Sequence, residues 1–355
     1  MKIGYSCWGF LGNGIKDTPD GGRSHRLTLL KELIRQGVEI VMLQKNRDLI
    51  EGNQSFSRKN LIFSGELPEI DALFVEYRWK IVGRNYKVRK NNPAYTPDFD
   101  RQSELINFYN NRNIPIIIWD KDQKLGKNEI KGIKNLIVFE PALKPRFNRK
   151  SLLFPMDNHR TKIVLKLIGK YKKNIKSSKL CYIGNQYERD GSFKEFINKP
   201  ASMLDTKTPV FGNWNKYPEK YKQNMQKFSN VEFKGRVQFN KVNNIYKKSF
   251  STVLIAPRRY YITGHFTQRL FEAMWGLCIP FTPQQYHGWQ GLIIKDFIIR
   301  SGKDLINKIK KLETTPDSDI RRMFDRQFEK LNLFNASKQA SIIINEINNH
   351  NGRLG

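Results

Sequence analysis

The sequence contains few cysteines, few acidic residues and no long apolar segment. Its three cysteines, Cys7, Cys181 and Cys278, form no CxxC pair and leave an odd thiol, which argues against a disulfide framework and against a zinc site. No apolar run approaches the roughly 18 residues of a membrane-spanning helix. The opening segment MKIGYSCWGF has the pattern of a β-strand rather than of a signal peptide. These features predict a cytoplasmic protein that does not enter a membrane and whose cysteines are small core residues.

The shortage of acidic residues gives the chain a large positive charge. Its 63 Lys and Arg residues outnumber 33 Asp and Glu residues, for a formal net charge of +30. A field of this sign concentrates polyanions at the surface and releases counterions when it meets phosphates. We therefore expect nucleic acid as a partner. The alternatives are a Lys-, Asn- and Ile-rich composition inherited from an AT-rich genome, or an anionic membrane surface.

Strand-like runs alternate with helical periodicity along the chain, which is typical of βαβ units and parallel sheets. At 355 residues the chain is longer than one hydrophobic core usually supports, so two domains are expected. A first Rossmann-like domain, residues 1–154, has a helix between residues 24 and 37. Its strands are expected at Met1–Ser6, Val38–Leu43, near Leu61, Ala72–Tyr77, Ile114–Asp120 and Asn135–Glu140.

The alternation restarts after a crossover at Ser151–Asn158 and predicts a second Rossmann-like domain, residues 155–332. Its strands are expected at Lys179–Asn185, Thr208–Asn213, Val231–Val237, Ser251–Pro257 and Cys278–Pro283. A last helical stretch, Ser318–Asn348, is too long for this domain alone. We expect it to bend at Asn332–Ser337, so that residues 333–355 return to the first domain. Ligands bind at the carboxyl ends of parallel strands, so a cleft between two facing sheets is the expected site.

Two segments follow strands of the second domain and carry candidate nucleotide-binding groups. In YIGNQYERDGS, Gly184 and Asn185 turn the backbone and Arg189 precedes a helix start, where an arginine and free N–H groups can bind phosphate. In FKGRV, Gly235 and Arg236 could line a base. A turn-stabilising arginine and a plain turn are the respective alternatives.

The segment RLFEAMWGLCIP places Arg269 and Glu272 at positions i and i+3 of a short helix. An arginine can clamp a pyrophosphate with two hydrogen bonds, and a carboxylate can accept both hydroxyls of a ribose. The pair therefore predicts a nucleoside diphosphate site, and His265, one turn earlier, could touch the diphosphate. An exposed intrahelical ion pair is the alternative.

Asp120 ends the very apolar strand IPIIIWD at the expected edge of the first domain. A buried carboxylate at such a place can act as the base that takes a proton from an acceptor hydroxyl. With Asp122 it forms a D-x-D pattern, but this pattern lies in the first domain, away from the nucleotide arginines, and no other ligand motif indicates a metal. A helix-capping or surface aspartate is the alternative.

A basic tract, RWKIVGRNYKVRK, follows a strand end of the first domain and contains no acid. Cationic heads can bind phosphates while an aromatic side chain replaces a base lifted from the duplex. The tract therefore predicts a DNA-binding segment, and Arg160–Lys179 is a second acid-free basic tract that could extend it. The residues of the first tract proposed to contact DNA are Arg78, Trp79, Lys80, Arg84, Lys87, Arg89 and Lys90.

RLFEAMWGLCIPF, together with YIGNQYERDGSFKEFI, VFGNWNKYPEKY and FKGRVQFNKVNNIY, resembles the phage DNA β-glucosyltransferases, which are GT-B enzymes that modify 5-hydroxymethylcytosine. The segments LLFPMDN and MKIGYS and the aspartate after IIIW are also similar to this family in their order and spacing. The resemblance implies an α/β GT-B fold. It places the diphosphate and ribose of a UDP-sugar on Arg269 and Glu272, a second phosphate contact on Arg189, and the catalytic base on Asp120.

The segment DGGRSHR departs from the family, which has a glutamate just before the first helix. Asp20, Arg23 and His25 stand there instead, so His25 is a second catalytic candidate, with helix capping as its alternative. GGRSH before an amphipathic helix also resembles the entry loop of other GT-B enzymes, retaining ones included, but the extra carboxylate of those retaining enzymes would fall at Gly264. Inversion is therefore favoured, with retention as the open alternative. The donor sugar is glucose by family default, with arabinose also open.

These expectations combine into a monomeric, UDP-sugar-dependent DNA glycosyltransferase of an infected bacterial cytoplasm, acting on 5-hydroxymethylcytosine in double-stranded DNA without a tightly bound cofactor. A divalent metal is compatible with the reaction but is not indicated by a ligand motif. The alternatives are a GT-B enzyme acting on a cell-surface polymer or lipid, and a non-catalytic DNA-binding protein.

Overall fold

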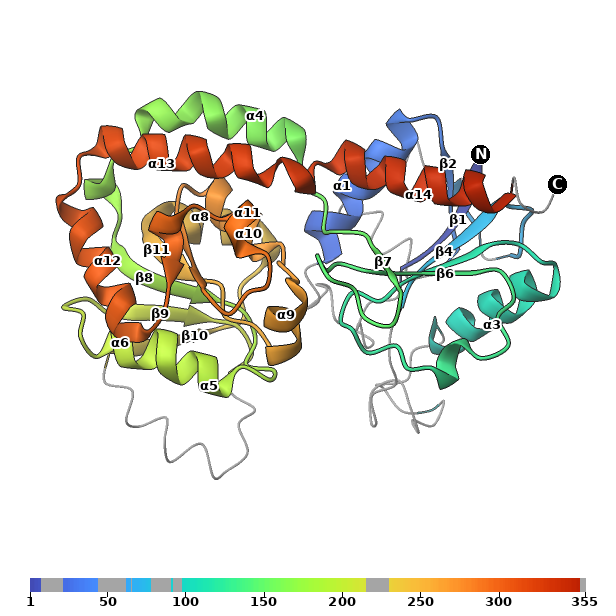
Figure 1. Ribbon diagram of the computed structural model, residues 1–355, viewed down its shortest axis with the longest axis horizontal. Helices are drawn as coiled ribbons and strands as arrows, with labels where there is room; N and C mark the ends of the chain where they lie inside the picture. Colours follow the sequence, from blue (N-terminus) through green and yellow to red (C-terminus); the bar gives the residue numbers. More distant parts are fainter. Residues whose placement is uncertain are drawn as a thin grey trace. The chain divides into compact units, whose positions relative to one another are not determined.

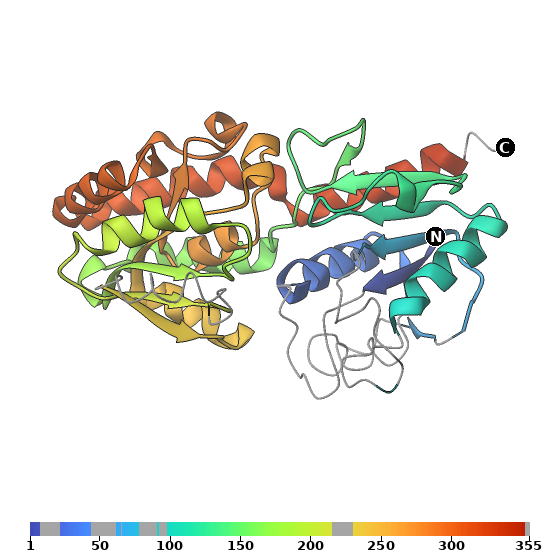
Figure 2. The ribbon, with the colours of Figure 1, turned by 90° about the horizontal axis from the view of Figure 1, so that it is seen from below.

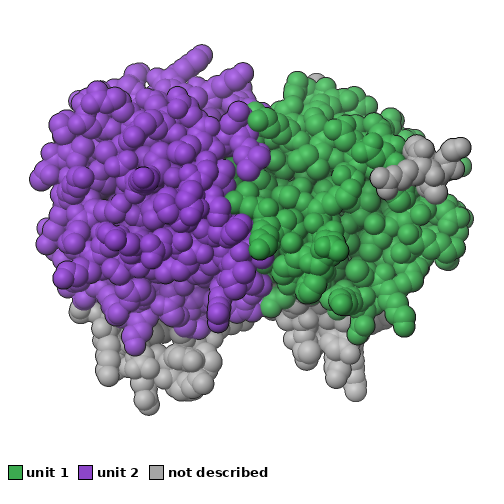
Figure 3. Space-filling view, viewed as in Figure 1, with its two compact units in different colours: residues 1–156, 334–355 green, residues 157–333 purple. Residues whose placement is uncertain are grey.

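The computed structural model describes residues 1–7, 22–43, 62–64, 66–77, 91, 98–214 and 230–351. The chain divides into two compact units, which Figure 3 shows in separate colours. Unit 1 comprises Met1–Met156 and Phe334–Gly355, and unit 2 comprises Asp157–Leu333. Each unit is built on one parallel sheet, as the alternation of strands and helices predicts.

The sheet of unit 1 has the strand order β3-β2-β1-β4-β5-β6-β7. Its strands are β1 (Lys2–Cys7), β2 (Glu39–Met42), β3 (Ile62–Phe63), β4 (Ala72–Glu76), β5 (Ile116–Trp119), β6 (Leu136–Glu140) and β7 (Lys150–Ser151). Every residue of β4 and β5 is buried, which is why these strands read as continuous apolar runs. The chain order reverses at β1, which pairs in parallel with both β2 and β4. This reversal places a topological switch point at the carboxyl end of β1.

Helices cover both faces of the unit 1 sheet. α1 (Gly22–Arg35) and α14 (Ala336–Asn351) lie side by side on one face, and α3 (Asp98–Asn111) covers the other (Figure 1, Figure 2). Gln36 Nε2 donates to Ser337 O at 3.0 Å, and Leu153 N donates to Gln339 Oε1 at 2.8 Å. These contacts tie α14 to unit 1, so the predicted return of the last helix is confirmed.

The sheet of unit 2 has the order β10-β9-β8-β11-β12-β13, with its switch point at β8. Its strands are β8 (Ser178–Ile183), β9 (Thr208–Phe211), β10 (Val231–Gly235), β11 (Ser249–Val253), β12 (Ile279–Pro283) and β13 (Ile298–Ile299). The α-helices of this unit are α4 (Asn158–Leu167), α5 (Asp190–Phe193), α6 (Lys199–Ala201), α8 (Phe239–Lys248), α9 (Arg258–Thr263), α10 (Arg269–Trp275), α11 (Trp289–Leu292), α12 (Gly302–Thr314) and α13 (Asp317–Lys330).

Short helical turns connect the main elements. They are η2 (Asn128–Ile130), η3 (Ile168–Lys170), η4 (Lys173–Ile175), η5 (Lys194–Asn198), η6 (Lys295–Phe297) and η7 (Leu331–Phe334). The last of these interrupts the long C-terminal helical stretch between α13 and α14, within the segment where a bend is predicted. Leu331 and Phe334 are fully buried at this break.

Part of the second basic tract, Arg160–Lys179, makes contacts inside unit 2. Lys176 Nζ donates to the carbonyls of Lys247 and Leu277, each at 2.9 Å. Lys179 pairs with Glu313 at 2.8 Å and with Asp205 at 3.0 Å. These two cations serve the packing of their own unit, while Lys162, Lys166, Lys170 and Lys172 of the same tract are exposed.

Candidate functional site

Three glycines lie at the carboxyl ends of neighbouring strands in unit 2. Gly184 follows β8 and donates its N–H to Phe211 O at 2.8 Å, while Gly212 follows β9 and donates to Gly235 O at 2.8 Å. A Cβ on Gly212 would lie 2.2 Å from Gly184 O, so a side chain there would push the two turns apart. The backbone can therefore approach a ligand closely at this edge.

Asn185 holds the same edge together. Its Oδ1 accepts the N–H of Asn213 at 2.7 Å, and the indole N–H of Trp214 donates to Gly184 O at 2.8 Å. Arg236, next to Gly235, is exposed. The predicted nucleotide-lining residues Gly184, Asn185 and Gly235 thus belong to one rim of the sheet, with Arg236 beside it.

Arg269, the first residue of α10, brings a partly buried cation to this rim. Its Nη1 donates to the Tyr182 hydroxyl at 2.7 Å and its Nε to Thr267 Oγ1 at 3.2 Å. A Cβ added to Gly184 would lie 2.9 Å from Nη1, so the guanidinium stands directly beside the glycine turn. No carboxylate pairs with Arg269 in the described part of the chain. A guanidinium held by neutral hydroxyls keeps its charge available for an anion.

Glu272 lies one turn along α10 and is partly buried. Burial lowers the pKa of Arg160 in α4, and the charge of Glu272 opposes this by raising it. Arg160 also donates to Asn243 Oδ1 at 2.7 Å and lies over the ring of Trp275 at 4.4 Å. The carboxylate therefore stands next to a cation fixed by other contacts.

Arg189 immediately precedes α5, as the sequence predicts. Its Nη1 donates to the carbonyls of Tyr187 at 2.8 Å and Asn185 at 3.1 Å, which closes the turn after β8. Its buried Nε has no hydrogen-bond partner among the described residues. Arg189 thus stabilises the turn and still has donor capacity for a phosphate.

His265 lies in the turn before α10, and its ring is buried. Its side chain is 1% exposed, and its ring stacks on Tyr260 with the centroids 3.7 Å apart. Gly264, in the left-handed region with φ of +65°, ends α9 just before it. The histidine is therefore packed into the turn that leads to α10.

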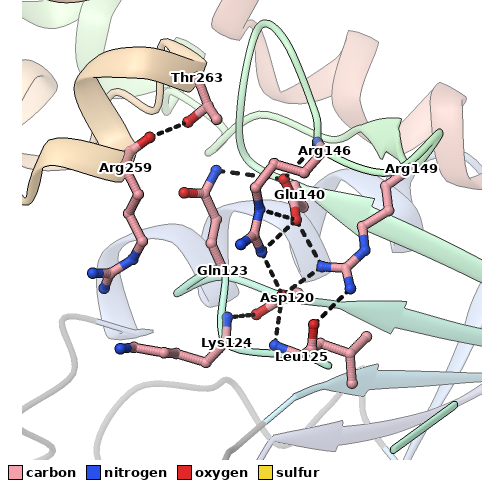
Figure 4. A network of polar contacts seen from close by, with 9 residues as sticks. All are labelled: Asp120, Gln123, Lys124, Leu125, Glu140, Arg146, Arg149, Arg259 and Thr263. Atoms are coloured by element: carbon pink, nitrogen blue, oxygen red, sulfur yellow. Dashed lines mark hydrogen bonds and ion pairs between the residues drawn. The ribbon is translucent and has the colours of Figure 1, made fainter. Parts of the chain in front are cut away.

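In unit 1, Asp120 follows β5 and lies in a buried network with Glu140, Arg146 and Arg149 (Figure 4). Its oxygens accept from the backbone N–H groups of Lys124 and Leu125 at 2.8 and 2.9 Å. Arg149 Nη1 and Arg146 Nη2 approach Asp120 Oδ2 at 2.8 and 3.5 Å. Burial raises the pKa of Asp120, against the lowering effect of these hydrogen bonds and of Arg149.

A second buried group, the Glu76 cluster, consists of Tyr5, His25, Arg26, Glu76 and Lys121. Each of these side chains is at most 4% exposed. Arg26 donates to both oxygens of Glu76 at 2.7 Å, the Tyr5 hydroxyl donates at 2.5 Å, and Lys121 also pairs with the carboxylate. His25 Nε2 lies 3.3 Å from Lys121 Nζ, and its ring packs against Phe154. His25 therefore belongs to a charged cluster at the switch point of unit 1.

The Glu76 cluster yields a stability prediction. Burial raises the pKa of Glu76, but Arg26 and Lys121 lower it more, so the pKa lies well below the usual 4.5. Glu76→Gln leaves two buried cations without their counter-ion, and we expect a loss of about 3–5 kcal/mol in the free energy of unfolding. Because the folded-state pKa is depressed, this contribution is complete above the ordinary pKa and is lost as pH falls toward the folded value.

Urea unfolding at a series of pH values measures this effect. The difference between Glu76→Gln and the natural protein should be largest at neutral pH and shrink below pH 4.5, the ordinary pKa. Asp319→Asn is the control, because Asp319 pairs with Arg322 on the surface, where an ion pair contributes at most about 1 kcal/mol. Equal, pH-independent losses in the two variants would contradict the prediction.

Sequence reasoning missed Glu76 and Glu140, although the signal that identified Asp120 was present at both. Each is the last residue of a buried strand, in ALFVE and LIVFE. The proposed DNA contacts Arg78, Trp79, Lys80, Arg84, Lys87, Arg89 and Lys90 lie outside the described residues. None of the described helices is long and apolar enough to cross a membrane. Within the same residues no three His, Cys, Asp or Glu side chains form a metal-holding group.

Comparison with known proteins identifies the fold. No family model and no curated protein matches the sequence. Among solved structures, the T4 phage β-glucosyltransferase matches with a TM-score of 0.61 and 15% identity, over 98% of this chain and 99% of that one. The chain has the GT-B fold.

Other GT-B glycosyltransferases match over similar lengths. Anabaena HepE, solved in complex with UDP-glucose, has a TM-score of 0.58 and 10% identity, covering 97% of this chain and 99% of its own. AviGT4, a glycosyltransferase involved in avilamycin A biosynthesis, has a TM-score of 0.56 and 12% identity, covering 98% and 97%. The predicted GT-B fold class is confirmed.

Proposed function

We propose that this protein is a UDP-sugar-dependent glycosyltransferase that transfers a sugar, glucose by default with arabinose as the alternative, to 5-hydroxymethylcytosine in double-stranded DNA. The observation that carries the proposal is Arg269: a partly buried guanidinium without a carboxylate partner among the described residues, held by Tyr182 and Thr267 against Gly184. A cation of this kind, next to a glycine turn at a switch point, suits a diphosphate.

Further features support a UDP-sugar as the donor substrate and DNA as the acceptor substrate. Glu272 offers a carboxylate for the ribose hydroxyls, and Arg189 offers a second cation at the same rim. The formal net charge of +30 suits a polyanionic acceptor. The GT-B fold is shared with the T4 phage β-glucosyltransferase over nearly the whole chain. We further propose that the protein works as a monomer in the cytoplasm of an infected bacterium.

In the proposed reaction Asp120 is the base. It accepts the proton of the acceptor hydroxyl while that oxygen bonds to the anomeric carbon, and the bond from this carbon to the β-phosphate oxygen of UDP breaks with inversion. Arg269 and Arg189 stabilise the charge that develops on the departing UDP. The raised pKa of Asp120 suits proton uptake. Its longest contact, 3.5 Å from Arg146 Nη2, is the one that an acceptor hydroxyl would replace.

A transfer assay tests the proposal. The protein is incubated with duplexes that contain 5-hydroxymethylcytosine or ordinary cytosine and with a panel of UDP-sugars, with and without Mg²⁺. The masses of the nucleosides are then measured by mass spectrometry. We expect one sugar residue to be added to 5-hydroxymethylcytosine alone. Transfer to lipid or polysaccharide instead would indicate a different GT-B acceptor, and duplex binding without any transfer would indicate a non-catalytic DNA-binding protein.

A further inference from the structure

Phe147 is an exposed aromatic residue of unit 1. Its side chain is 67% exposed, the highest value for any Phe, Tyr or Trp in the part of the chain that the structure describes. It lies in the Phe147 loop, residues 145–149, between β6 and β7. Large aromatic side chains usually contribute through burial, so an aromatic at this position indicates a binding role rather than a folding role.

The backbone of the Phe147 loop is held in an uncommon conformation. Phe147 and Asn148 have φ values of +52° and +60°, two consecutive non-glycine residues in the left-handed region. Bulky side chains rarely adopt this region, and such strain persists only where the surrounding structure enforces it. The backbone conformation therefore fixes the direction in which the Phe147 side chain leaves the loop.

The buried network around Asp120 enforces this presentation. Arg146 and Arg149 flank Phe147 and Asn148, and both point toward the two carboxylates (Figure 4). Arg149 Nη1 bridges Asp120 at 2.8 Å and Glu140 at 2.7 Å, and Arg146 Nη2 donates to Glu140 at 2.8 Å. The two ends of the loop are thus fixed from inside unit 1 while its tip faces solvent.

Cations surround the exposed ring. The guanidinium carbons of Arg146 and Arg149 each lie 5.5 Å from its centroid, and Lys127 Nζ lies 5.9 Å away. The ring also borders a cavity of about 540 Å³, lined among others by Lys127, Asn148 and Lys150. An aromatic face with nearby cations and amides matches a nucleotide, whose base stacks while its phosphate pairs with a cation.

We infer that Phe147 stacks on a nucleobase of the DNA acceptor and that Lys127 binds an adjacent backbone phosphate. The inference rests on the proposed function for the identity of the acceptor. An enzyme that modifies a base inside a duplex must lift the base out of the stack, and an apolar wedge can occupy the resulting gap. The anchored Phe147 loop has the exposure and the rigidity for such a wedge.

Binding and base unstacking are measured without UDP-sugar, on a 5-hydroxymethylcytosine duplex with 2-aminopurine beside the target. We expect Phe147→Ala to raise Kd about 10-fold and to abolish the 2-aminopurine fluorescence increase, while Phe147→Trp retains both. Lys127→Ala should weaken binding to all duplexes alike. It should also reduce the slope of log Kd against log salt concentration by about one released ion. Met203→Ala is the matched control, because Met203 is an exposed apolar side chain of unit 2, 52% exposed, outside both basic tracts, and it should change nothing.

The outcomes separate this inference from the proposed function. If the Phe147→Ala variant binds the duplex and unstacks the base as well as the natural protein does, the stacking role is overturned, even if sugar transfer is normal. Conversely, if no sugar is transferred to any duplex but Phe147→Ala still loses affinity relative to Met203→Ala, the stacking role stands and the transferase proposal fails. Absence of duplex binding by the natural protein would overturn the inference, whatever other acceptor is glycosylated.

Discussion

Asp120→Asn is expected to lower kcat by about 10²- to 10⁴-fold at saturating DNA and UDP-sugar, the range in which a general base contributes. The amide keeps one oxygen, which can accept from only one of the backbone N–H groups of Lys124 and Leu125, since these donate to different oxygens of Asp120, and the amide cannot take a proton. Binding of UDP should be unchanged, because the candidate nucleotide residues lie in unit 2. Transfer assays quenched at a series of times measure kcat, and titration with UDP measures the Kd for UDP.

Glu140→Gln is the matched control for Asp120. Both carboxylates are fully buried and both accept from Arg146 and Arg149, but only Asp120 is proposed to touch the acceptor. Glu140→Gln should loosen the Phe147 loop and raise the KM for DNA while leaving kcat within a few-fold. Equal losses of kcat in the two variants, accompanied by equal losses of stability, would assign Asp120 to the anchoring of the loop alone.

The pH profile provides a second check on Asp120. The base must be ionised to act, so kcat falls as pH drops through its pKa. Because burial raises the pKa of Asp120 above the ordinary value of 3.8, the acidic limb of the profile should inflect above that value. An inflection below it would contradict a buried aspartate as the base.

Arg269→Ala is expected to weaken UDP binding by about 100-fold or more, because two charge-assisted hydrogen bonds to a diphosphate are lost. Arg269→Lys should recover only part of this loss, since an ammonium cannot make the planar two-point contact of a guanidinium. The fold should tolerate both changes, because the partners of Arg269 are the neutral hydroxyls of Tyr182 and Thr267. Calorimetric titration with UDP measures the affinity.

Arg300→Ala is the control for Arg269. Arg300 is a surface arginine, 75% exposed, whose partner is Asp304 within its own segment. Its removal lowers the net charge by the same amount and should leave UDP binding unchanged. Similar losses of affinity in the two variants would show that overall charge, rather than the rim of β8, controls nucleotide binding.

Much of the fold was readable in the sequence because both sheets are parallel. Strands such as β4 and β5 are buried on both faces and appear as short apolar runs bounded by helical periodicity. The edge strands β7 and β13, of two residues each, were missed, whereas the equally short edge strand β3 was predicted near Leu61. The break between α13 and α14 was predicted correctly from the length of the helical stretch.

The candidate nucleotide site was partly readable for a similar reason. Glycines and arginines that directly follow strands mark the carboxyl rim of a parallel sheet, and this rule identified Gly184, Gly235 and Arg189. Spacing along a helix identified Arg269 and Glu272. The burial of His265 against Tyr260 was not readable, because stacking depends on the turn between α9 and α10.

The sequence by itself determined the alternation of strands and helices, the excess of positive charge and the polar residues at strand ends, because each is a local property of consecutive residues. Only the tertiary structure decided which charges meet. Arg149 lies 29 residues from Asp120 and Lys121 lies 45 residues from Glu76, and no local periodicity relates positions so far apart. Pairing of buried charges follows from the order of strands in the sheet, which brings the carboxyl ends of β4, β5 and β6 together.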